Sequence, residues 1–351
     1  MRIAPPFDIS LFVPCKGAYQ WVLTRVKRWQ EAQPDAQGRP EGWRVLSRRP
    51  SLAPGDRVLI LSGERGAGKS WLLQYMAEHD RQTSPGAVYI DLEKRLVSAG
   101  AEAWVQAVER QVFKRCGQGS ALLLLDAVPP QLDHHLRALE EWILRPHLAH
   151  RSSMVVMALD HPSQVCWRAP ALRGGESYAL TLFEEPESWD QLRRLRQRGL
   201  MRDGLDDRAI LEQASGLPLL TYLLATHERR EAFELLLQHW FSRIPDEDCE
   251  RMWNYTIAVS PLRVLEHVTI ERMLEVYYRV LPEAAGYPAH PSGVRNALLK
   301  HWLARMVPGA PGRIALVPSV RHAAVELLKA IDPPLYIVLR EMAQVLGGGQ
   351  Q

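Results

Sequence analysis

The sequence lacks the features that mark secreted and membrane proteins. Its four cysteines, Cys15, Cys116, Cys166 and Cys249, lie far apart and form no C-x-x-C pair, so no disulfide framework is indicated. No stretch approaches the roughly 18 uninterrupted apolar residues of a membrane span. The residues after Met1 also contain no long apolar segment of the kind found in a secretory signal peptide. We therefore expect a soluble protein of the reducing cytoplasm, with no membrane partner.

A large excess of charge of one sign is also missing. The formal net charge of the 351 residues is +3, which is too small to indicate a nucleic-acid or membrane surface by itself. With 46% hydrophobic and 24% charged residues, the chain can form two or three globular units, each with its own core.

The sequence does contain a glycine-rich segment, GERGAGKS at 63–70, which matches G-x-x-x-x-G-K-[ST] without a mismatch. It follows an apolar run at 58–61 and opens a helical pattern, which is the context of a phosphate-binding loop. Glycines let backbone N–H groups turn toward an anion, and the start of the helix adds its positive dipole end. Lys69 is expected to reach the β- and γ-phosphates, and the Ser70 hydroxyl to bind Mg²⁺. The predicted nucleotide-binding residues here are Gly63, Glu64, Arg65, Gly66, Ala67, Gly68, Lys69, Ser70 and Trp71.

A second motif, ALLLLD at 121–126, is an apolar run that ends in an acidic residue. When such a run follows a phosphate loop on the same sheet, its carboxylate lies at the strand's C-terminal end and coordinates magnesium. A core strand that ends in aspartate by chance is the alternative. The distance from GERGAGKS favours the metal site, with Ser70 and Asp126 as ligands.

Strand and helix patterns alternate between residues 51 and 183. Apolar runs at 58–61, 87–92, 121–126, 154–159 and 177–182 are separated by helical patterns at 71–79, 103–116 and 132–149. This alternation predicts an α/β fold with a mostly parallel sheet covered on both faces. Residues 51–183 are the predicted P-loop domain. Residues 1–50 form an extension whose amphipathic helix at 16–33 should pack against it, with partner binding as the alternative.

The rest of the chain is predominantly helical. Helical patterns at 188–198, 206–215 and 217–227 predict a helical lid over residues 184–240. Helices at 247–259, 269–280 and 292–306, followed by the turn VPGAPG and a strand at 313–317, predict a winged helix over 241–335. Residues 336–351 complete the chain as a helix and tail.

In these motifs and this order of elements, residues 50 to 330 resemble the STAND class of P-loop ATPases, which is related to the AAA+ group and includes the nucleotide-binding cores of immune receptors. Besides GERGAGKS and LLLLD, the segment SGLPLL places Gly216 and Pro218 as a G-x-P motif. The resemblance implies that Pro218 contacts the nucleotide, ATP or ADP with Mg²⁺. It also implies a switch in signalling or defence that self-associates and acts with a separate effector or sensor protein.

Two departures from that family concern hydrolysis. Asp126 is followed by Ala127, where hydrolytic relatives place a second acidic residue. The fourth strand pattern ends at Asp160, where the family commonly has an arginine that senses the γ-phosphate. We therefore expect at most a slow ATPase. The candidate catalytic residues are Asp160 and, donated by a neighbouring subunit, Arg168 or Arg173.

A DNA-engaging ATPase that resembles replication initiators is the alternative function, because those proteins also carry a lid and a winged helix. Residues 240–330 hold 11 Lys and Arg against 9 Asp and Glu, and Arg295, Lys300 and Arg305 spread around their predicted helix. DNA is therefore possible but not favoured. A small-molecule kinase would need a substrate pocket and a base that the sequence does not indicate.

Overall fold

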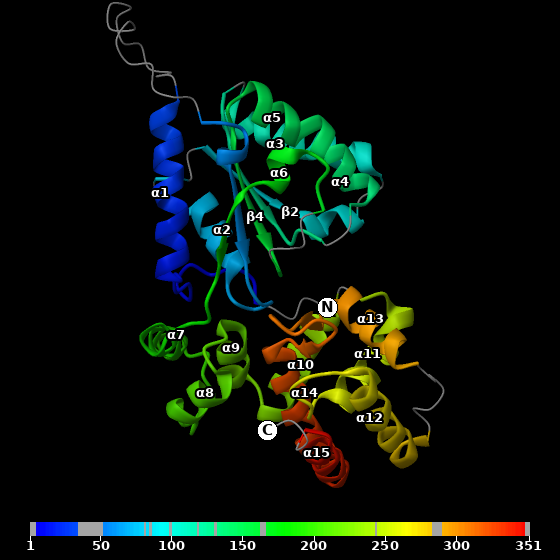
Figure 1. Ribbon diagram of the computed structural model, residues 1–351. Coiled ribbons are helices and arrows are strands. Elements are labelled where there is room, and N and C mark those ends of the chain that lie inside the picture. Colours follow the sequence, from blue (N-terminus) through cyan, green and yellow to red (C-terminus); the bar gives the residue numbers. More distant parts are fainter. Residues whose placement is uncertain are drawn as a thin grey trace, which may run out of the picture. The chain divides into compact units, whose positions relative to one another are not determined.

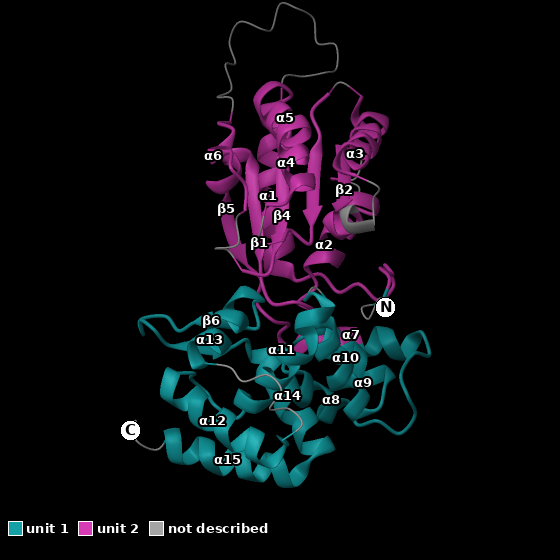
Figure 2. Cartoon of the chain, turned by 90° about the vertical axis from the view of Figure 1, so that its right-hand side faces the viewer, with its two compact units in different colours: residues 1–5, 192–351 teal, residues 6–191 magenta. Residues whose placement is uncertain are grey.

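The computed structural model describes residues 5–33, 52–80, 82–83, 86–97, 100–117, 119–129, 132–161, 166–242, 244–282 and 290–347. The chain divides into two compact units, residues 6–191 and residues 192–351 together with 1–5 (Figure 2). Within the described ranges, no helix is long and apolar enough to cross a membrane. Much of the predicted N-terminal extension, residues 34–50, lies outside the described residues.

The first unit is built on a parallel sheet. Its strands lie in the order β2-β3-β4-β1-β5, and all recorded pairings between them are parallel. The predicted α/β fold class is therefore confirmed. β5 begins one residue earlier and ends three residues earlier than the run predicted at 177–182. The strands are β1 (Val58–Ser62), β2 (Ala87–Asp91), β3 (Leu122–Asp126), β4 (Met154–Leu159) and β5 (Glu176–Ala179).

Both faces of this sheet are buried, which explains the unbroken apolar runs. Successive side chains of a strand point to opposite faces, so Val58 and Ile60 join one core while Leu59 and Leu61 join the other. Figure 1 shows one face covered by α1 (Lys16–Ala32) and α2 (Lys69–Glu78). The other face carries α3 (Ala101–Cys116), α4 (His134–Leu139), α5 (Arg145–His150) and α6 (Pro170–Arg173). The unit also contains η2 (Gly55–Arg57), η4 (Leu92–Val97) and the π-helical turn η5 (Glu140–Leu144), which divides the single helix predicted at 132–149.

Helix α1 packs on its own unit along an apolar stripe. Val22, Val26 and Trp29 are buried against the sheet, and Trp29 Nε1 donates a hydrogen bond to the Ser152 carbonyl at 2.7 Å. Arg25 forms an ion pair with Glu176 of the edge strand β5. The stripe that makes this helix amphipathic is thus used inside the unit.

The second unit begins within α7 (Glu185–Gln197) and is predominantly helical. One of its helices, α10 (Arg229–Phe241), is missing from the sequence prediction, although its buried Ala232, Phe233, Leu236, Leu237 and Trp240 form a helical stripe. The remaining elements are α8 (Asp207–Ala214), α9 (Pro218–Thr226), α11 (Asp246–Val259), α12 (His267–Val280), α13 (Pro291–Lys300), β6 (Ala304–Met306), β7 (Ile314–Leu316), α14 (Pro318–Ile331) and α15 (Pro333–Gly347).

The helix predicted over 292–306 is too long. α13 ends at Lys300, Trp302 takes a left-handed backbone conformation with φ of 60°, and Ala304–Met306 pairs antiparallel with Ile314–Leu316. Arg305 therefore lies on a strand, and the helical spread of charge predicted for it does not apply. Three helices followed by a hairpin is the element order expected of a winged helix, and that assignment stays a prediction.

Candidate nucleotide-binding site

The phosphate loop lies between β1 and α2, and its glycines have specific roles. Gly66 and Gly68 have φ values of 84° and 92°, a region that favours glycine, and Gly68 is the N-cap of α2. A Cβ atom on Gly63 would lie 3.1 Å from Leu180 Cβ, so this glycine permits a close approach to the chain after β5. The glycines thus allow a tight turn that leads directly into the N-terminus of α2.

Lys69 is held by the loop that precedes it. Its Nζ donates hydrogen bonds to the Gly63 carbonyl at 2.7 Å and to the Glu64 carbonyl at 2.9 Å. The residue is 7% exposed, so its ammonium group is largely shielded from water. A cation held in such a site interacts strongly with an anion that reaches it.

Asp160, the residue after β4, faces this cation. Its carboxylate lies 3.4 Å from Lys69 Nζ and accepts a hydrogen bond from Arg65 Nε at 2.7 Å. Asp160, which stands where the STAND family commonly has an arginine, thus binds two cations of the phosphate loop. Asp160 is brought there because β4 is the neighbour of β1 in the sheet.

Asp126 lies at the same edge of the sheet, with three hydrogen-bond donors around it. Ser70 Oγ donates to its Oδ1 at 2.9 Å, and the Ala127 backbone N–H donates to the same atom at 2.8 Å. The Tyr89 hydroxyl donates to Oδ2 at 2.5 Å. A carboxylate that accepts three hydrogen bonds is fixed in position.

Tyr89 is the residue of this site that the sequence analysis missed. It lies on β2, where it also accepts a hydrogen bond from Gln74 Nε2 at 2.9 Å. Burial, followed by the charge of Asp126, raises the pKa of Tyr89 far above its usual range, so the phenol keeps its proton and acts as donor. The register that aligns Asp91 with Asp126 brings Tyr89 near Asp126. No sequence motif indicates this contact.

The residues present fit a magnesium ion. Ser70 Oγ and Asp126 Oδ1 are neighbouring oxygen atoms at the edge of the phosphate loop. Mg²⁺ commonly takes one or two protein oxygen ligands and completes its shell with water and substrate phosphates, so a larger acidic cluster is not required. The described residues contain no group of three or more His, Cys, Asp and Glu side chains that could hold a metal.

The remaining predicted residues lie elsewhere. Trp71 is on α2, where its indole ring packs edge-on against Phe7 with a centroid distance of 5.5 Å. Pro218 opens α9 in the second unit and is buried. Its contact with a nucleotide stays a prediction.

Arg168 and Arg173 are exposed and lie away from the phosphate loop of their own unit. Arg173 ends α6, which packs against η2 before the start of β1, while the phosphate loop follows the end of β1. The length of β1 alone separates these ends by about 16 Å. Arg168 precedes α6, and its backbone N–H donates to the buried carboxylate of Glu140. Neither arginine is placed to act on a nucleotide in its own chain.

No protein-family model matches the sequence, and no curated protein matches it. Several solved structures are similar. The RuvB Holliday junction branch migration motor of Thermotoga maritima is 14% identical, with 92% of this chain and 98% of that chain covered and a TM-score of 0.42. Cdc6p from Pyrobaculum aerophilum is 13% identical, with 97% of each chain covered and a TM-score of 0.43. Domain III of the Thermotoga maritima replication initiation protein DnaA is 17% identical over 68% of this chain and 91% of that chain, with a TM-score of 0.37.

The likeness is one of fold. At these identities and TM-scores it assigns neither a family nor an activity to this chain. The parallel sheet and the GERGAGKS loop together give the first unit a P-loop nucleotide-binding fold.

Proposed function

We propose that this chain binds ATP or ADP with Mg²⁺ and acts as a nucleotide-dependent switch. The observation that carries the proposal is the convergence of Lys69, Ser70 and Asp126 at the C-terminal edge of the parallel sheet, beside the N-terminus of α2. Ligands of open α/β sheets bind at this edge. Lys69 would hold the β- and γ-phosphates, and Ser70 and Asp126 would hold the metal ion. The ion, when bound, neutralises charge on the phosphates.

Slow hydrolysis follows from the groups around this edge. Ala127, directly after Asp126, has a methyl group that cannot accept a proton from water. The oxygens of Asp160 are engaged by Arg65 Nε and Lys69 Nζ, so this carboxylate is a poor base for an attacking water. The site therefore has the parts for binding without a committed base. A neighbouring copy could supply Arg168 or Arg173, and hydrolysis would then rise with assembly.

The switch role rests on two features. The STAND resemblance supports a nucleotide that biases the arrangement of the two units and thereby self-association or the exposure of a surface for an effector protein. Asp160 supports a bistable site, since Lys69 and Arg65 can pair either with its carboxylate or with phosphate oxygens. A change of partner at one cluster is the kind of local event that switches use.

The proposal is tested by mass photometry of the full chain with ADP, with ATP and Mg²⁺, and with duplex DNA, together with phosphate release over a series of protein concentrations. We expect nucleotide-dependent assembly and phosphate release well below the roughly 1 to 100 per second of efficient kinases. Lys69→Ala should abolish both responses, while Lys114→Ala, a substitution of an exposed lysine on α3, should leave them unchanged.

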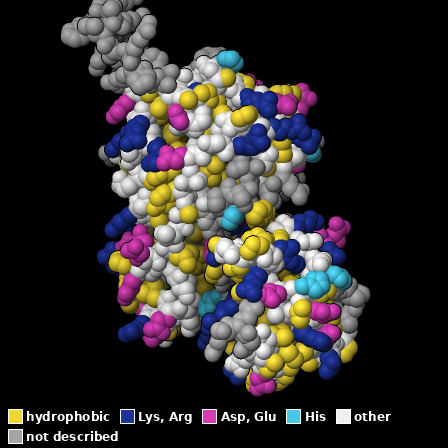
Figure 3. Space-filling view, in the orientation of Figure 1, with side chains coloured by type: hydrophobic (Ala, Val, Ile, Leu, Met, Phe, Trp, Pro, Cys, Tyr) yellow, Lys and Arg dark blue, Asp and Glu magenta, His cyan; other side chains and the backbone are white. Residues whose placement is uncertain are grey.

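Two outcomes would contradict the proposal. A fast rate that is independent of protein concentration would indicate an ordinary ATPase with its own base. Assembly that depends on DNA and not on nucleotide would favour the DNA-engaging alternative. On the face shown in Figure 3, acidic and basic side chains are interspersed, and no broad surface of one sign indicates DNA.

A further inference from the structure

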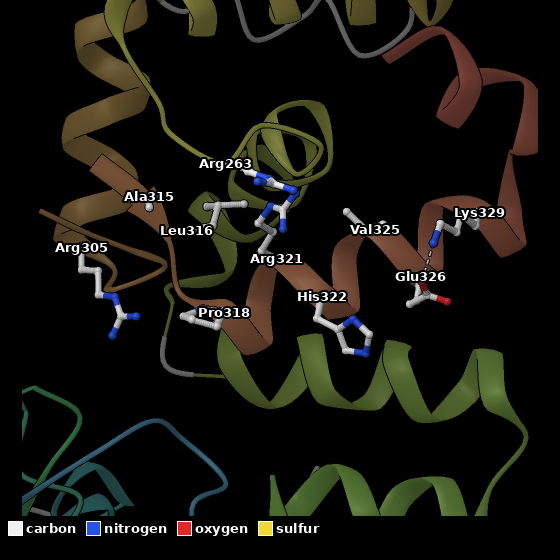
Figure 4. A pocket seen from close by; sticks show the side chains of 10 residues that line it. All are labelled: Arg263, Arg305, Ala315, Leu316, Pro318, Arg321, His322, Val325, Glu326 and Lys329. Carbon is white, nitrogen blue, oxygen red and sulfur yellow. Dashed lines mark hydrogen bonds and ion pairs between the residues drawn. The ribbon is translucent and has the colours of Figure 1, made fainter. Parts of the chain in front are cut away.

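The second unit contains a cavity of about 420 Å³ whose lining carries several positive charges. It lies between the loop that precedes α12, the β6–β7 hairpin and α14, all within one unit (Figure 4). Arg263, Arg305 and Arg321 contribute three guanidinium groups. Leu316 and Val325 contribute apolar surface. This volume is within the range of about 300–1,000 Å³ typical of small-molecule sites.

Backbone pairing brings the three segments that carry these arginines to the lining of one cavity. Leu265, two residues after Arg263, exchanges backbone hydrogen bonds with Ile314 of β7, at 2.7 and 3.2 Å. In the hairpin register Arg305 lies opposite Ala315. Arg321, on the first turns of α14, reaches back to the loop, where its Nε donates to the Leu262 carbonyl at 2.9 Å and its NH2 group to the Pro261 carbonyl at 3.2 Å.

Arg321 is therefore pre-organised. Two carbonyl oxygens fix its guanidinium, which still has further N–H donors, so a ligand would not have to immobilise a flexible side chain. Arg263 projects toward it in Figure 4. Burial, and next the positive charge of Arg263, lower the pKa of Arg321. Like charges at close range in a partly desolvated cavity are unfavourable unless an anion joins them.

No acidic side chain among the described residues pairs with Arg263, Arg305 or Arg321. The one carboxylate in the lining, Glu326, is bound by Lys329 at 2.6 Å and by Arg229. The contrast with Arg313 of the same hairpin is informative, since Arg313 forms an ion pair with Glu266 at 2.7 Å. The cavity thus keeps a surplus of positive charge that its own carboxylate does not balance.

We propose that this cavity is a second ligand site, separate from the phosphate loop, for a small molecule that bears a phosphate group. Guanidinium groups bind phosphate through paired N–H donors, and a doubly charged phosphate matches several arginines better than a single carboxylate does. Leu316 and Val325 offer contact to an organic part such as a base. A nucleic-acid backbone fits less well, because it needs a continuous outer surface, whereas Arg321 is half-buried and held by the Pro261 and Leu262 carbonyls at the cavity.

The test uses the full chain carrying Lys69→Ala, which removes the cation of the phosphate loop, and isothermal titration calorimetry with AMP as the probe. We expect one AMP per chain, with affinity at least about tenfold lower when Arg263→Gln and Arg305→Gln are added. Both arginines are exposed and make no hydrogen bond to other described residues, so these substitutions should leave the fold intact. Arg313→Gln on the same hairpin is the matched control and should retain binding.

Three results would overturn the proposal. The first is that AMP does not bind at millimolar concentration. The second is that AMP binds equally with and without the Arg263 and Arg305 substitutions. The third is that the chain binds duplex DNA but not AMP, and that the two substitutions abolish the DNA binding. The proposed function fails separately. If Lys69→Ala leaves ATP affinity unchanged in a chain that carries the Arg263 and Arg305 substitutions, the phosphate-loop assignment is wrong whatever AMP does.

Discussion

Replacing Asp160 by asparagine is expected to tighten ATP binding. The Asp160 carboxylate lies 2.7 Å from Arg65 Nε and 3.4 Å from Lys69 Nζ. A phosphate group must therefore compete with the Asp160 carboxylate for Lys69, and once bound it lies near the negative charge of Asp160. Asparagine keeps the shape and an acceptor oxygen while removing the charge. Competition and repulsion both decrease, so both changes favour binding.

The size of the effect follows from Coulomb's law. Two unit charges about 4 Å apart interact by about 4 kcal/mol at an effective dielectric constant of about 20. The Gly63 and Glu64 carbonyls still hold Lys69, and water replaces part of what is lost. We therefore take about one third to two thirds of that energy, or about 1.4 to 2.8 kcal/mol. This range corresponds to an affinity about 10- to 100-fold higher.

Titration of a fluorescent ATP analogue at fixed Mg²⁺ measures the change, and the same titration with the ADP analogue should show a smaller gain because the γ-phosphate is absent. Asp91→Asn is the control. Asp91 ends β2 at the same sheet edge, three strands from β1 and thus about 14 Å away, and should change affinity less than about twofold.

The folded state supplies a second readout of opposite sign. Arg65 is 6% exposed and loses a charged partner in the Asp160→Asn protein, so the free energy of unfolding without nucleotide should decrease by about 1 to 3 kcal/mol. ATP should then raise the melting temperature more than in the wild type. A folded Asp160→Asn protein with unchanged or weaker ATP affinity would refute the competition and mean that Asp160 assists binding.

Three further predictions concern other groups. Lys69→Ala should lower ATP affinity by at least about 100-fold with an unchanged circular dichroism spectrum, since Lys69 contacts loop carbonyls and Asp160 but fills no apolar core. Asp126→Asn should weaken the Mg²⁺ dependence of ATP binding more than ATP binding itself, and a wild-type response to Mg²⁺ would mean that Asp126 is not a ligand. Burial, and next the charge of Arg151, lower the pKa of His147 from 6.5 to about 4, so the folded state disfavours the protonated imidazole. Stability from this neutral imidazole is complete above pH 6.5 and is lost as the pH falls toward 4, which predicts a free energy of unfolding about 2 kcal/mol lower at pH 5 than at pH 7. Urea titrations at both pH values should show this decrease in the free energy of unfolding for the His150→Gln control. For His147→Gln the free energy of unfolding should differ less between pH 7 and pH 5.

The sequence predicts best what is encoded locally. β4 begins and ends where its apolar run does, because a strand buried on both faces is uninterrupted by polar residues. The phosphate loop is recognised because its glycines, lysine and serine are consecutive. The prediction of one helix over 292–306 is wrong because the end of that segment is determined by a contact with another segment. The residues of β6 do not form a strand without β7, and a three-residue strand carries no period of its own.

Contacts between distant segments could not be predicted. The hydrogen bond between Tyr89 and Asp126 depends on the register of β2 against β3, and the ion pair between Arg65 and Asp160 depends on β4 lying beside β1. Composition likewise shows only a small basic surplus over 240–330. The cavity with Arg263, Arg305 and Arg321 exists because a bridge, a hairpin and a helix bring them to one place.

The strand order also explains why one acidic residue can govern this site. β4 lies between β1, which leads into the phosphate loop, and β3, which ends in Asp126, so the residue after β4 lies at the sheet edge between these two parts of the site. An arginine there would attract a γ-phosphate, whereas Asp160 binds the same cations that a phosphate would bind. Arg65, within the loop itself, balances part of the negative charge of Asp160, which Lys69 alone would otherwise have to balance. Arg65 and Asp160 therefore act together. Arg65 stabilises a buried carboxylate at the end of β4, and that carboxylate gives Lys69 an alternative partner to phosphate.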